Sequence, residues 1–481
     1  MSHRQQLTLV AAILGSAVAS IDGSVVNVAL PAIAKDLGGG LEAQQWVSNA
    51  YLLTLGSLIL VGGSLGDIYG ERRVFATGVG LFGICSIGCA LAPTVGVLIA
   101  LRALQGVAAA LLTPASLAVI VNAFAPSERG AAVGAWTAWG GIASIAGPLV
   151  GGALVDVTWW RWVFLVNVPI VLTTIALIFA AIPVSRPVSG RRLDVVGALL
   201  GALALAGFVF ALIDAPRHGW TSPEIYLPLI GGIACAAAFF AQEHRTAQPL
   251  LDLGLFEHRN FAVGNLETLT MYAGLSVLFF FLTIFLQQVA GYTALQSGLA
   301  TVPVTLVMFA TSRTFGSLAD HHGPRRLMGV GPLVAAAGMQ LLERVGMHVA
   351  YLTDLLPALL IFALGLSMTV APLTATVLAG ADETDAGIAS AINNAVARVA
   401  GLVGTSAVGA AVAGSLPGAT FGRNSASVAA FHDAILICCL LVAAGGIAGL
   451  LGIVDPKRPV DARHCSGGQL AGVPRPAVEG S

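Results

Sequence analysis

Long, nearly uninterrupted runs of apolar residues fill this sequence, and they restrict the possible folds more than any other feature. Apolar residues make up 57% of the 481 residues and charged residues only 10%, whereas a soluble domain carries roughly a quarter charged residues. A soluble surface of this size would need far more polar side chains. A bilayer core takes about 20 apolar residues per helix, and lipid forces the backbone polar groups to be satisfied internally. The sequence therefore predicts an all-α membrane protein.

Fourteen apolar stretches, bounded by charges or by Pro and Gly turns, are typical of transmembrane helices. We expect these helices at residues 7–30, 46–66, 74–92, 95–123, 130–153, 162–182, 195–213, 225–241, 261–289, 296–318, 327–346, 355–379, 386–413 and 432–454. The stretch 327–346 is the weakest, because Glu343 and Arg344 cut its apolar run short. An even number of helices places both ends of the chain on the same side of the membrane.

The basic residues indicate which side that is. With the N-terminus in the cytoplasm, fifteen of the 23 Lys and Arg residues fall in cytoplasmic segments and five in outer loops, and Arg102, Arg313 and Arg398 remain inside helices. The positive-inside rule then predicts that both termini are cytoplasmic. One missed helix would scramble this alternation, so the charge pattern also supports the count.

Charge and cysteine content argue against several other classes of protein. The formal net charge is −1, so nothing indicates a nucleic-acid partner. Cys85 and Cys89 share a helix face, but nearby His or carboxylate ligands are missing, so we interpret them as packing residues and expect no metal or cofactor. The first apolar run is too long for a signal peptide and contains Asp22. The tail 456–481 is rich in Pro, Gly and charge and is predicted to be disordered.

An eleven-residue pattern occurs twice, 253 residues apart. Residues 63–73 are GSLGDIYGERR and residues 316–326 are GSLADHHGPRR, and each copy closes the second helix of a six-helix set. Two parallel six-helix halves are typical of secondary transporters, in which one half rocks against the other around a midplane site. We predict pseudo-symmetric halves at 1–186 and 246–455, with an inserted helix pair at 187–245.

Four motifs resemble those of one known family, the major facilitator superfamily. Residues 63–73 resemble its motif A, residues 102–106 (RALQG) its motif B and residues 147–152 (GPLVGG) its motif C, the antiporter motif. Residues 21–31 (IDGSVVNVALP) resemble the first-helix motif of its fourteen-helix drug:proton antiporters. The resemblance implies a transporter that exports multiple drugs or antibiotics in exchange for protons.

The resemblance also implies roles for motif residues. Asp67 would join a charge network between the halves that holds the outward-open state and is loosened by protonation. The conformational switch would comprise Gly63, Asp67, Gly70, Arg72, Arg73 and, from the second copy, Asp320. The alternative is ordinary turn and topology chemistry, in which the glycines allow close helix approach.

Motif C has a direct physical interpretation. Gly147, Gly151 and Gly152 permit tight helix contact, and Pro148 bends its helix by removing one backbone hydrogen bond. Ala143 stands where this motif usually carries another Gly, so we expect slightly looser packing there.

Charged side chains within the membrane cost about 3 kcal/mol or more and usually serve a function. Asp22 and Glu267 are the two carboxylates well inside predicted helices. Asp22 and Arg102 lie at similar depths, about 10–12 Å from the outer surface at 1.5 Å per residue, so they could share a site. A buried carboxylate can hold a proton and release it once wetted, so Asp22 is our first candidate for proton coupling, tuned by Arg102. The alternative is a packing hydrogen bond from Asp22 to Ser24 or Asn27.

Glu267 is the second candidate for proton coupling or substrate contact. Arg313 lies at about the same depth on the next helix, so a structural ion pair between Glu267 and Arg313 is the alternative.

Several further residues are candidates for substrate binding. Arg398 lies halfway along its helix beside Asn393 and Asn394, and it would contact an anionic or carbonyl-bearing substrate or else pair with backbone carbonyls. The same helix has no carboxylate, which weakens the expectation of divalent cationic drugs. Aromatic residues would line a large apolar pocket, although such residues face lipid as often. The full candidate set is Asp22, Asn27, Trp136, Trp139, Tyr272, Phe279, Asn393, Asn394 and Arg398.

These observations predict a proton-driven exporter of hydrophobic, drug-like compounds, cationic ones included, in a bacterial inner membrane. The partners would be a small-molecule substrate, protons and lipid, and the chain would act as a monomer. The alternatives are an exporter of one endogenous metabolite or, less favoured, a nutrient importer. A receptor or membrane-embedded enzyme is disfavoured, because no nucleophile–base pair, metal cluster or nucleotide loop is present in the sequence.

Overall fold

All fourteen predicted segments are helical in the structure, a computed structural model that describes residues 1–184, 193–246, 249–379 and 386–455. The tail predicted to be disordered, 456–481, lies outside the described residues. Thirteen helices of the described chain are long and apolar enough to cross a membrane. The fourteenth, α12 (Arg325–Gln340), has 16 residues, and a 3₁₀ turn at Leu341–Arg344 extends it. This is the segment in which two charges shorten the apolar run.

The helices divide into a first half, an inserted pair and a second half. The first half contains α1 (His3–Leu37), α2 (Gly40–Tyr69), α3 (Glu71–Leu91), α4 (Val95–Ala123), α5 (Pro126–Val157) and a broken sixth helix, α6 (Trp162–Leu165) with α7 (Asn167–Ala181). The inserted pair is α8 (Val195–His218) and α9 (Pro223–Glu243). The second half contains α10 (Arg259–Ile284), α11 (Ala294–His322), α12, α13 (Leu356–Ala379), α14 (Ala386–Ala413) and α15 (Ser425–Gly452), with π turns at Phe285–Val289 and Tyr351–Leu355.

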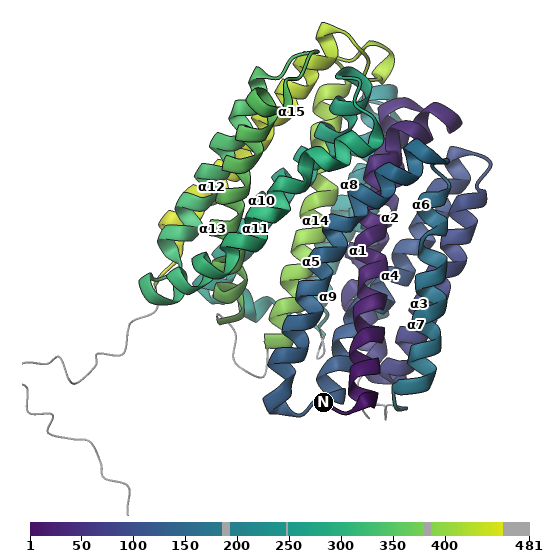
Figure 1. Cartoon of the computed structure of the whole chain (residues 1–481), viewed down its shortest axis with the longest axis vertical. Coiled ribbons are helices and arrows are strands. Elements are labelled where there is room, and N and C mark those ends of the chain that lie inside the picture. Colours follow the sequence, from purple (N-terminus) through teal and green to yellow (C-terminus); the bar gives the residue numbers. More distant parts are fainter. Residues whose placement is uncertain (185–192, 247–248, 380–385, 456–481) are drawn as a thin grey trace, which may run out of the picture.

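The same packing pattern occurs in both halves. In the first half α1 packs against α5 and α7, and α4 packs against α2 and α3; in the second half α10 packs against α14 and α15, and α13 against α11 and α12. The halves meet through two equivalent pairs, α2 with α14 and α5 with α11. Figure 1 shows the two groups side by side, with the N-terminus at the foot of the first. The contacts among α1–α7 therefore have counterparts among α10–α15.

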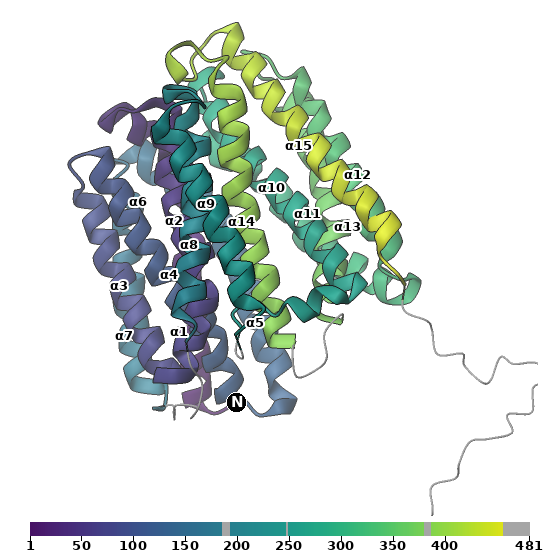
Figure 2. The same cartoon turned by 180° about the vertical axis from the view of Figure 1, so that it is seen from behind.

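The inserted pair lies across the seam between the halves, as Figure 2 shows from behind. α8 packs against α9 and also contacts α2 of the first half and α14 of the second. The indole Nε1 of Trp46 on α2 donates to Asp214 Oδ2 on α8 at 3.0 Å, and Arg217 pairs with Glu42 at 3.6 Å. The pair is thus attached to the half that precedes it and also touches the half that follows.

Candidate functional site

Asp22 lies at the centre of a buried polar cluster in the first half. It is fully buried on α1, and Arg102 on α4 is 1% exposed. The Arg102 guanidinium donates from Nη1 to Asp22 Oδ2 at 2.5 Å and from Nε to the Val47 carbonyl at 3.1 Å. Asp22 and Arg102, expected at similar depths in the membrane, are therefore in contact. Each side chain neutralises the buried charge of the other.

Two amides complete the cluster. Gln105 Nε2 and Asn167 Nδ2 each donate to Asp22 Oδ1 at 3.0 Å. Both amides also contact the hydroxyl of Ser86, at 2.9 and 3.3 Å, and Gln105 Oε1 accepts from Arg102 at 2.7 Å. Asp22 thus accepts three hydrogen bonds, which is the environment of an ionised carboxylate.

Sequence reasoning did not select Gln105 and Asn167. Gln105 stands inside the segment that resembles motif B, one helical turn after Arg102, and that spacing was an available signal. Asn167 is the one amide in the apolar stretch of α6 and α7, and an amide there needs a buried partner. Which partner it meets depends on how α7 packs against α1 and α3, which the sequence pattern does not specify.

The alternative partners considered for Asp22 are wrong. Ser24 donates to the carbonyls of Ser20 and Ile21, both at 3.0 Å. Asn27 Oδ1 instead accepts from the hydroxyl of Ser48 at 3.3 Å. Asp22 therefore serves the interhelical cluster and not a local bend of α1.

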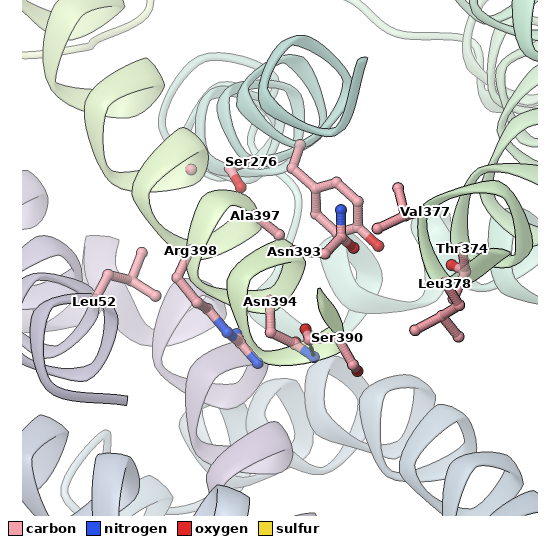
Figure 3. A pocket seen from close by; sticks show the side chains of 12 residues that line it. Leu52, Ser276, Thr374, Val377, Leu378, Ser390, Asn393, Asn394, Ala397 and Arg398 are labelled. Atoms are coloured by element: carbon pink, nitrogen blue, oxygen red, sulfur yellow. Dashed lines mark hydrogen bonds between the residues drawn. The ribbon is translucent and has the colours of Figure 1, made fainter. Parts of the chain in front are cut away.

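Two adjoining cavities lie in the bundle, the larger between the halves and the smaller mostly within the second half. The larger, of about 380 Å³, is lined by residues of α1, α2, α4, α5, α10, α11 and α14. The smaller, of about 320 Å³, is lined mainly by α10, α13 and α14 (Figure 3). Arg398, Leu52 and Ser276 line both. Each volume falls in the range of small-molecule sites, about 300–1,000 Å³.

Most of the candidate substrate-binding residues line one of these cavities. Asn27 and Phe279 line the larger, Tyr272, Asn393 and Asn394 the smaller, and Arg398 both. Asp22 itself lines neither cavity. Arg102 does border the larger one, and the Tyr51 ring lies 4.4 Å from its guanidinium carbon, so Arg102 connects the buried carboxylate to the cavity.

Trp136 and Trp139 require a correction, because neither lines these cavities. Trp136 packs against a small cluster that includes Ala12 and Phe124. Trp139 is 54% exposed. α5 contributes Pro148 to the larger cavity instead. We therefore leave both tryptophans out of the proposed substrate site.

Glu267 is fully buried on α10 and lines neither cavity. Neither of its carboxyl oxygens has a hydrogen-bond partner in the described part of the chain, so the considered ion pair with Arg313 is absent. The side chain faces two glycines of α15: a Cβ placed on Gly449 would lie 2.8 Å from Glu267 Oε2. A carboxyl group without partners in apolar surroundings is far more stable as the neutral acid.

The motif C glycines bring α5 against two neighbours. A Cβ on Gly147 would lie 1.9 Å from Ser24 Oγ, and one on Gly151 would lie 3.0 Å from Val25, both on α1. A Cβ on Gly152 would lie 2.5 Å from the Leu295 Cα on α11. These glycines thus set the contact of α5 with its own half and with the other half.

The two motif A copies share their turn geometry. Gly70 and its counterpart Gly323 end α2 and α11 with φ values of 88° and 86°, a region that glycine enters without strain. Arg72 donates to the Phe179 carbonyl at 3.3 Å, and the side chains of Arg73 and Asp320 are exposed. A Cβ on Gly63 would lie 3.8 Å from Pro114, an ordinary contact. The turn interpretation fits these residues, and a charge network through Asp67 stays a prediction.

Several hydrogen bonds join the halves at the end of the bundle remote from the N-terminus. Asp156 on α5 accepts from the backbone N–H groups of Ala294 and Leu295 at 3.0 and 2.9 Å. Gln287 donates to the Val28 carbonyl at 2.9 Å, and Gln45 to that of Thr405 at 2.8 Å. These bonds hold that end shut.

The smaller cavity reaches in the opposite direction. Its lining includes Leu378, next to the end of α13, and Ser390, near the start of α14. Both helix ends lie at the end of the bundle that holds the N-terminus. The smaller cavity therefore extends from the centre of the bundle towards that end. Within the described ranges, no group of three or more His, Cys, Asp or Glu side chains could hold a metal ion.

Comparisons with known proteins agree with the two-half helical arrangement described above. A family model described as Major Facilitator Superfamily matches residues 12–405. A puromycin resistance protein of Streptomyces alboniger is 39% identical over 394 residues, 80% of this chain and 77% of that protein. A cephamycin export protein of Amycolatopsis lactamdurans is 34% identical over 92% of both chains.

Solved structures show the same fold at low sequence identity. A bacterial homologue of the human lysosomal transporter Spinster, inward-facing and unoccupied, has a TM-score of 0.69 at 14% identity, covering 94% of this chain and 97% of that one. A D-xylose–proton symporter has a TM-score of 0.64 at 16% identity, covering 94% and 97%.

Proposed function

The chain belongs to the major facilitator superfamily, and from this premise we propose that it exports hydrophobic, drug-like or antibiotic compounds in exchange for protons. The observation that carries the proposal is the cavity between the halves with Arg102 at its wall, paired with the buried Asp22 behind it. Export is supported by the relatives, whose names state puromycin resistance and cephamycin export. The proposed protein is thus a multi-pass membrane transporter and not an enzyme.

In the proposed cycle, the halves rock about the central cavity and expose it to one side at a time. In the arrangement described, the end remote from the N-terminus is shut and Asp22 is satisfied as a carboxylate. This is the state that would load substrate from the cytoplasm after the proton has left. Opening at the other end would release the substrate and let Asp22 take a proton from outside. The motif A residues would then join the halves at the cytoplasmic end.

Orientation and assembly are part of the same proposal. Both termini would lie in the cytoplasm of a bacterial cell, as the basic residues indicate, and the unit of transport would be the single chain. The boundaries 1–186, 187–245 and 246–455 would delimit the two moving halves and the inserted pair.

A second candidate is dedicated export of one endogenous metabolite. It is supported by relatives named for a single antibiotic, such as the cephamycin export protein of Amycolatopsis lactamdurans. The two candidates differ in breadth of substrate, so a resistance panel of unrelated toxic compounds in a host without its own pumps separates them. A broad pattern supports multidrug export, and protection against one compound class supports the metabolite exporter.

Exchange of substrate for protons is tested in everted membrane vesicles with an acidic interior. Adding a compound found in the resistance panel should dissipate part of the pH gradient, because each imported substrate molecule releases protons outward. Vesicles without the protein serve as the control. If the gradient stays unchanged while the compound accumulates, proton exchange is excluded and export must use another driving force.

We further expect Glu267→Gln to fold normally and to move fewer protons per substrate molecule. Gln has the same shape and is neutral, like the protonated acid that the unpartnered site favours. Folding is measured by size-exclusion chromatography and thermal unfolding, and proton movement in the vesicles above. Loss of folded protein would indicate that the Glu267 carboxyl group serves the structure, and unchanged proton movement would remove Glu267 from the coupling site.

A further inference from the structure

The described residues that line the two cavities carry positive charge and no negative charge. No described Asp or Glu lines either cavity. The charged side chains that line them are Arg102, which borders the larger cavity, and Arg398, which lines both. A cavity without a carboxylate has nothing to neutralise a cationic ligand, and leaving such a ligand unpaired in the membrane is costly.

The two arginines differ in how well they are compensated. Arg102 is paired with Asp22 at 2.5 Å, so its charge is neutralised inside the protein. Among the residues that the structure describes, none is placed to accept a hydrogen bond from Arg398 or to form an ion pair with it, although its side chain is half-buried. Arg398 therefore supplies the uncompensated charge where the two cavities meet.

Other polar side chains on the cavity walls are also available to a ligand, although the Asn394 amide makes one long hydrogen bond of its own, to the Ser390 carbonyl at 3.5 Å. Asn394 lies one turn earlier on the same face of α14, and Figure 3 shows the two side chains pointing to the same side of the helix. The hydroxyl of Ser297 is 1% exposed, lines the larger cavity and has no partner in the described chain. Asn393 is different, because it is already engaged with Asn265 and Thr268 of α10. Apolar contact comes from residues such as Phe279 and Phe280.

We propose that this site takes compounds with an apolar ring body that present an acceptor oxygen to Arg398, and that it discriminates against cations. The inference rests on the proposed function for its setting and names the substrate class of that site. An acceptor oxygen can be a carboxylate or a neutral carbonyl, and both form charge-assisted hydrogen bonds with a guanidinium. Arg398 is the binding group, with Asn394 beside it on α14 and Ser297 as a separate polar group on the wall of the larger cavity.

The test uses three matched fluorescent probes on one ring system: anthracene-2-carboxylate, its methyl ester, and (2-anthrylmethyl)trimethylammonium. Binding to the purified full-length protein in lipid nanodiscs is measured by fluorescence anisotropy. We expect the cation to bind at least about tenfold more weakly than the better of the other two. We expect Arg398→Met to weaken binding of that better probe by about ten- to a hundredfold, the loss of one charge-assisted hydrogen bond.

The controls separate charge from general damage. Arg398→Lys keeps the charge and should recover part of the affinity. Arg313→Met removes another arginine of a membrane helix that lines neither cavity, and it should leave all three affinities unchanged. Loss of affinity for the acid alone identifies an anionic substrate, and loss for both acid and ester identifies any acceptor oxygen.

The proposal is overturned if the cation binds as well as the others, if Arg398→Met changes neither affinity, or if no probe binds up to its solubility. Export of a cationic compound with Arg398 dispensable would sink this inference and leave proton-driven export intact. Conversely, the expected probe preference in a protein that confers no resistance would contradict export and leave the chemistry of the site standing.

Discussion

Replacing Asp22 with Asn should reduce proton-coupled efflux to the level of vesicles that lack the protein. The Asp22 carboxylate accepts hydrogen bonds from Arg102, Gln105 and Asn167, and we propose that it is the group that exchanges the proton. An amide keeps the shape but cannot take up and release a proton at any relevant pH. The measurement is substrate-driven proton movement in everted vesicles, with substrate accumulation followed in parallel.

The same change should also destabilise the fold, and this effect must be separated from the loss of coupling. Arg102 would remain buried without its counter-charge, and breaking a buried ion pair costs about 3–5 kcal/mol. The double variant Asp22→Asn with Arg102→Met removes both charges, so it should recover most of the lost unfolding free energy without recovering coupling. A double variant that is stable and still couples protons would exclude this pair from the mechanism.

A matched control lies on the same helix. Asp36 is also on α1, accepts a hydrogen bond from Trp160 at 2.9 Å and is 40% exposed. Exposed pairs contribute about 1 kcal/mol or less, so Asp36→Asn should leave efflux and folding nearly unchanged. Full proton-coupled efflux in Asp22→Asn itself would show that the proton is carried elsewhere, with Glu267 as the next candidate.

The membrane fold was predictable because lipid leaves few alternatives to a helix. Apolar runs located the membrane-spanning helices of the described chain. The helix ends were less predictable: α1 begins at His3 after a Ser2 capping box and α15 begins at Ser425 after an Asn424 cap. Both helices start before their apolar run, because a helix extends beyond the membrane as far as its N-cap residue.

The charged residues of the site could be predicted from the sequence, and its neutral residues were harder to predict. Asp22, Arg102 and Arg398 stood out because charges within a membrane are rare and costly. Asn167 carried a weaker signal, because an amide costs less to bury and its partner depends on helix packing. Aromatic residues carried almost no sequence signal for the site, because Trp139 is exposed while Phe279 lines the larger cavity. Composition does not say which face of a helix meets lipid.

Equal depth on two helices correctly predicted a contact only where the two side chains also point towards each other. Equal depth correctly suggested contact between Asp22 and Arg102, whose helices pack together. Equal depth also suggested Glu267 with Arg313, but Glu267 points towards the glycines of α15. A rise of 1.5 Å per residue fixes height, and the direction of a side chain needs the tertiary structure.

Replacing Gly152 with Ala should displace the protein from the conformation described here, the second large effect that we expect. The added Cβ would lie 2.5 Å from Leu295 Cα and 2.7 Å from the Ala294 carbonyl oxygen, and backbone atoms cannot move aside as a side chain can. Both neighbours belong to the other half, so the clash opposes closure of the end remote from the N-terminus. Overpacking costs about 1–3 kcal/mol, which corresponds to a population shift of about 5- to 150-fold.

The displacement can be measured directly as a distance. Nitroxide labels at positions 157 and 299, where Val157 and Leu299 are exposed on α5 and α11, report the separation of the halves at this end. Gly152→Ala should move the distance distribution to longer values and lower the transport rate by at least about fivefold, because each cycle must return to the closed arrangement.

Two glycines of the same helix test whether the cause is the contact between the halves. A Cβ on Gly141 meets nothing within 4 Å, so Gly141→Ala should change neither distance nor rate. A Cβ on Gly151 would lie 3.0 Å from Val25 within its own half, so Gly151→Ala should lower stability while leaving the label distance unaltered. If Gly152→Ala behaves like Gly151→Ala, the glycine serves packing in general. If the distance lengthens for Gly152→Ala alone, motif C sets the closure between the two halves.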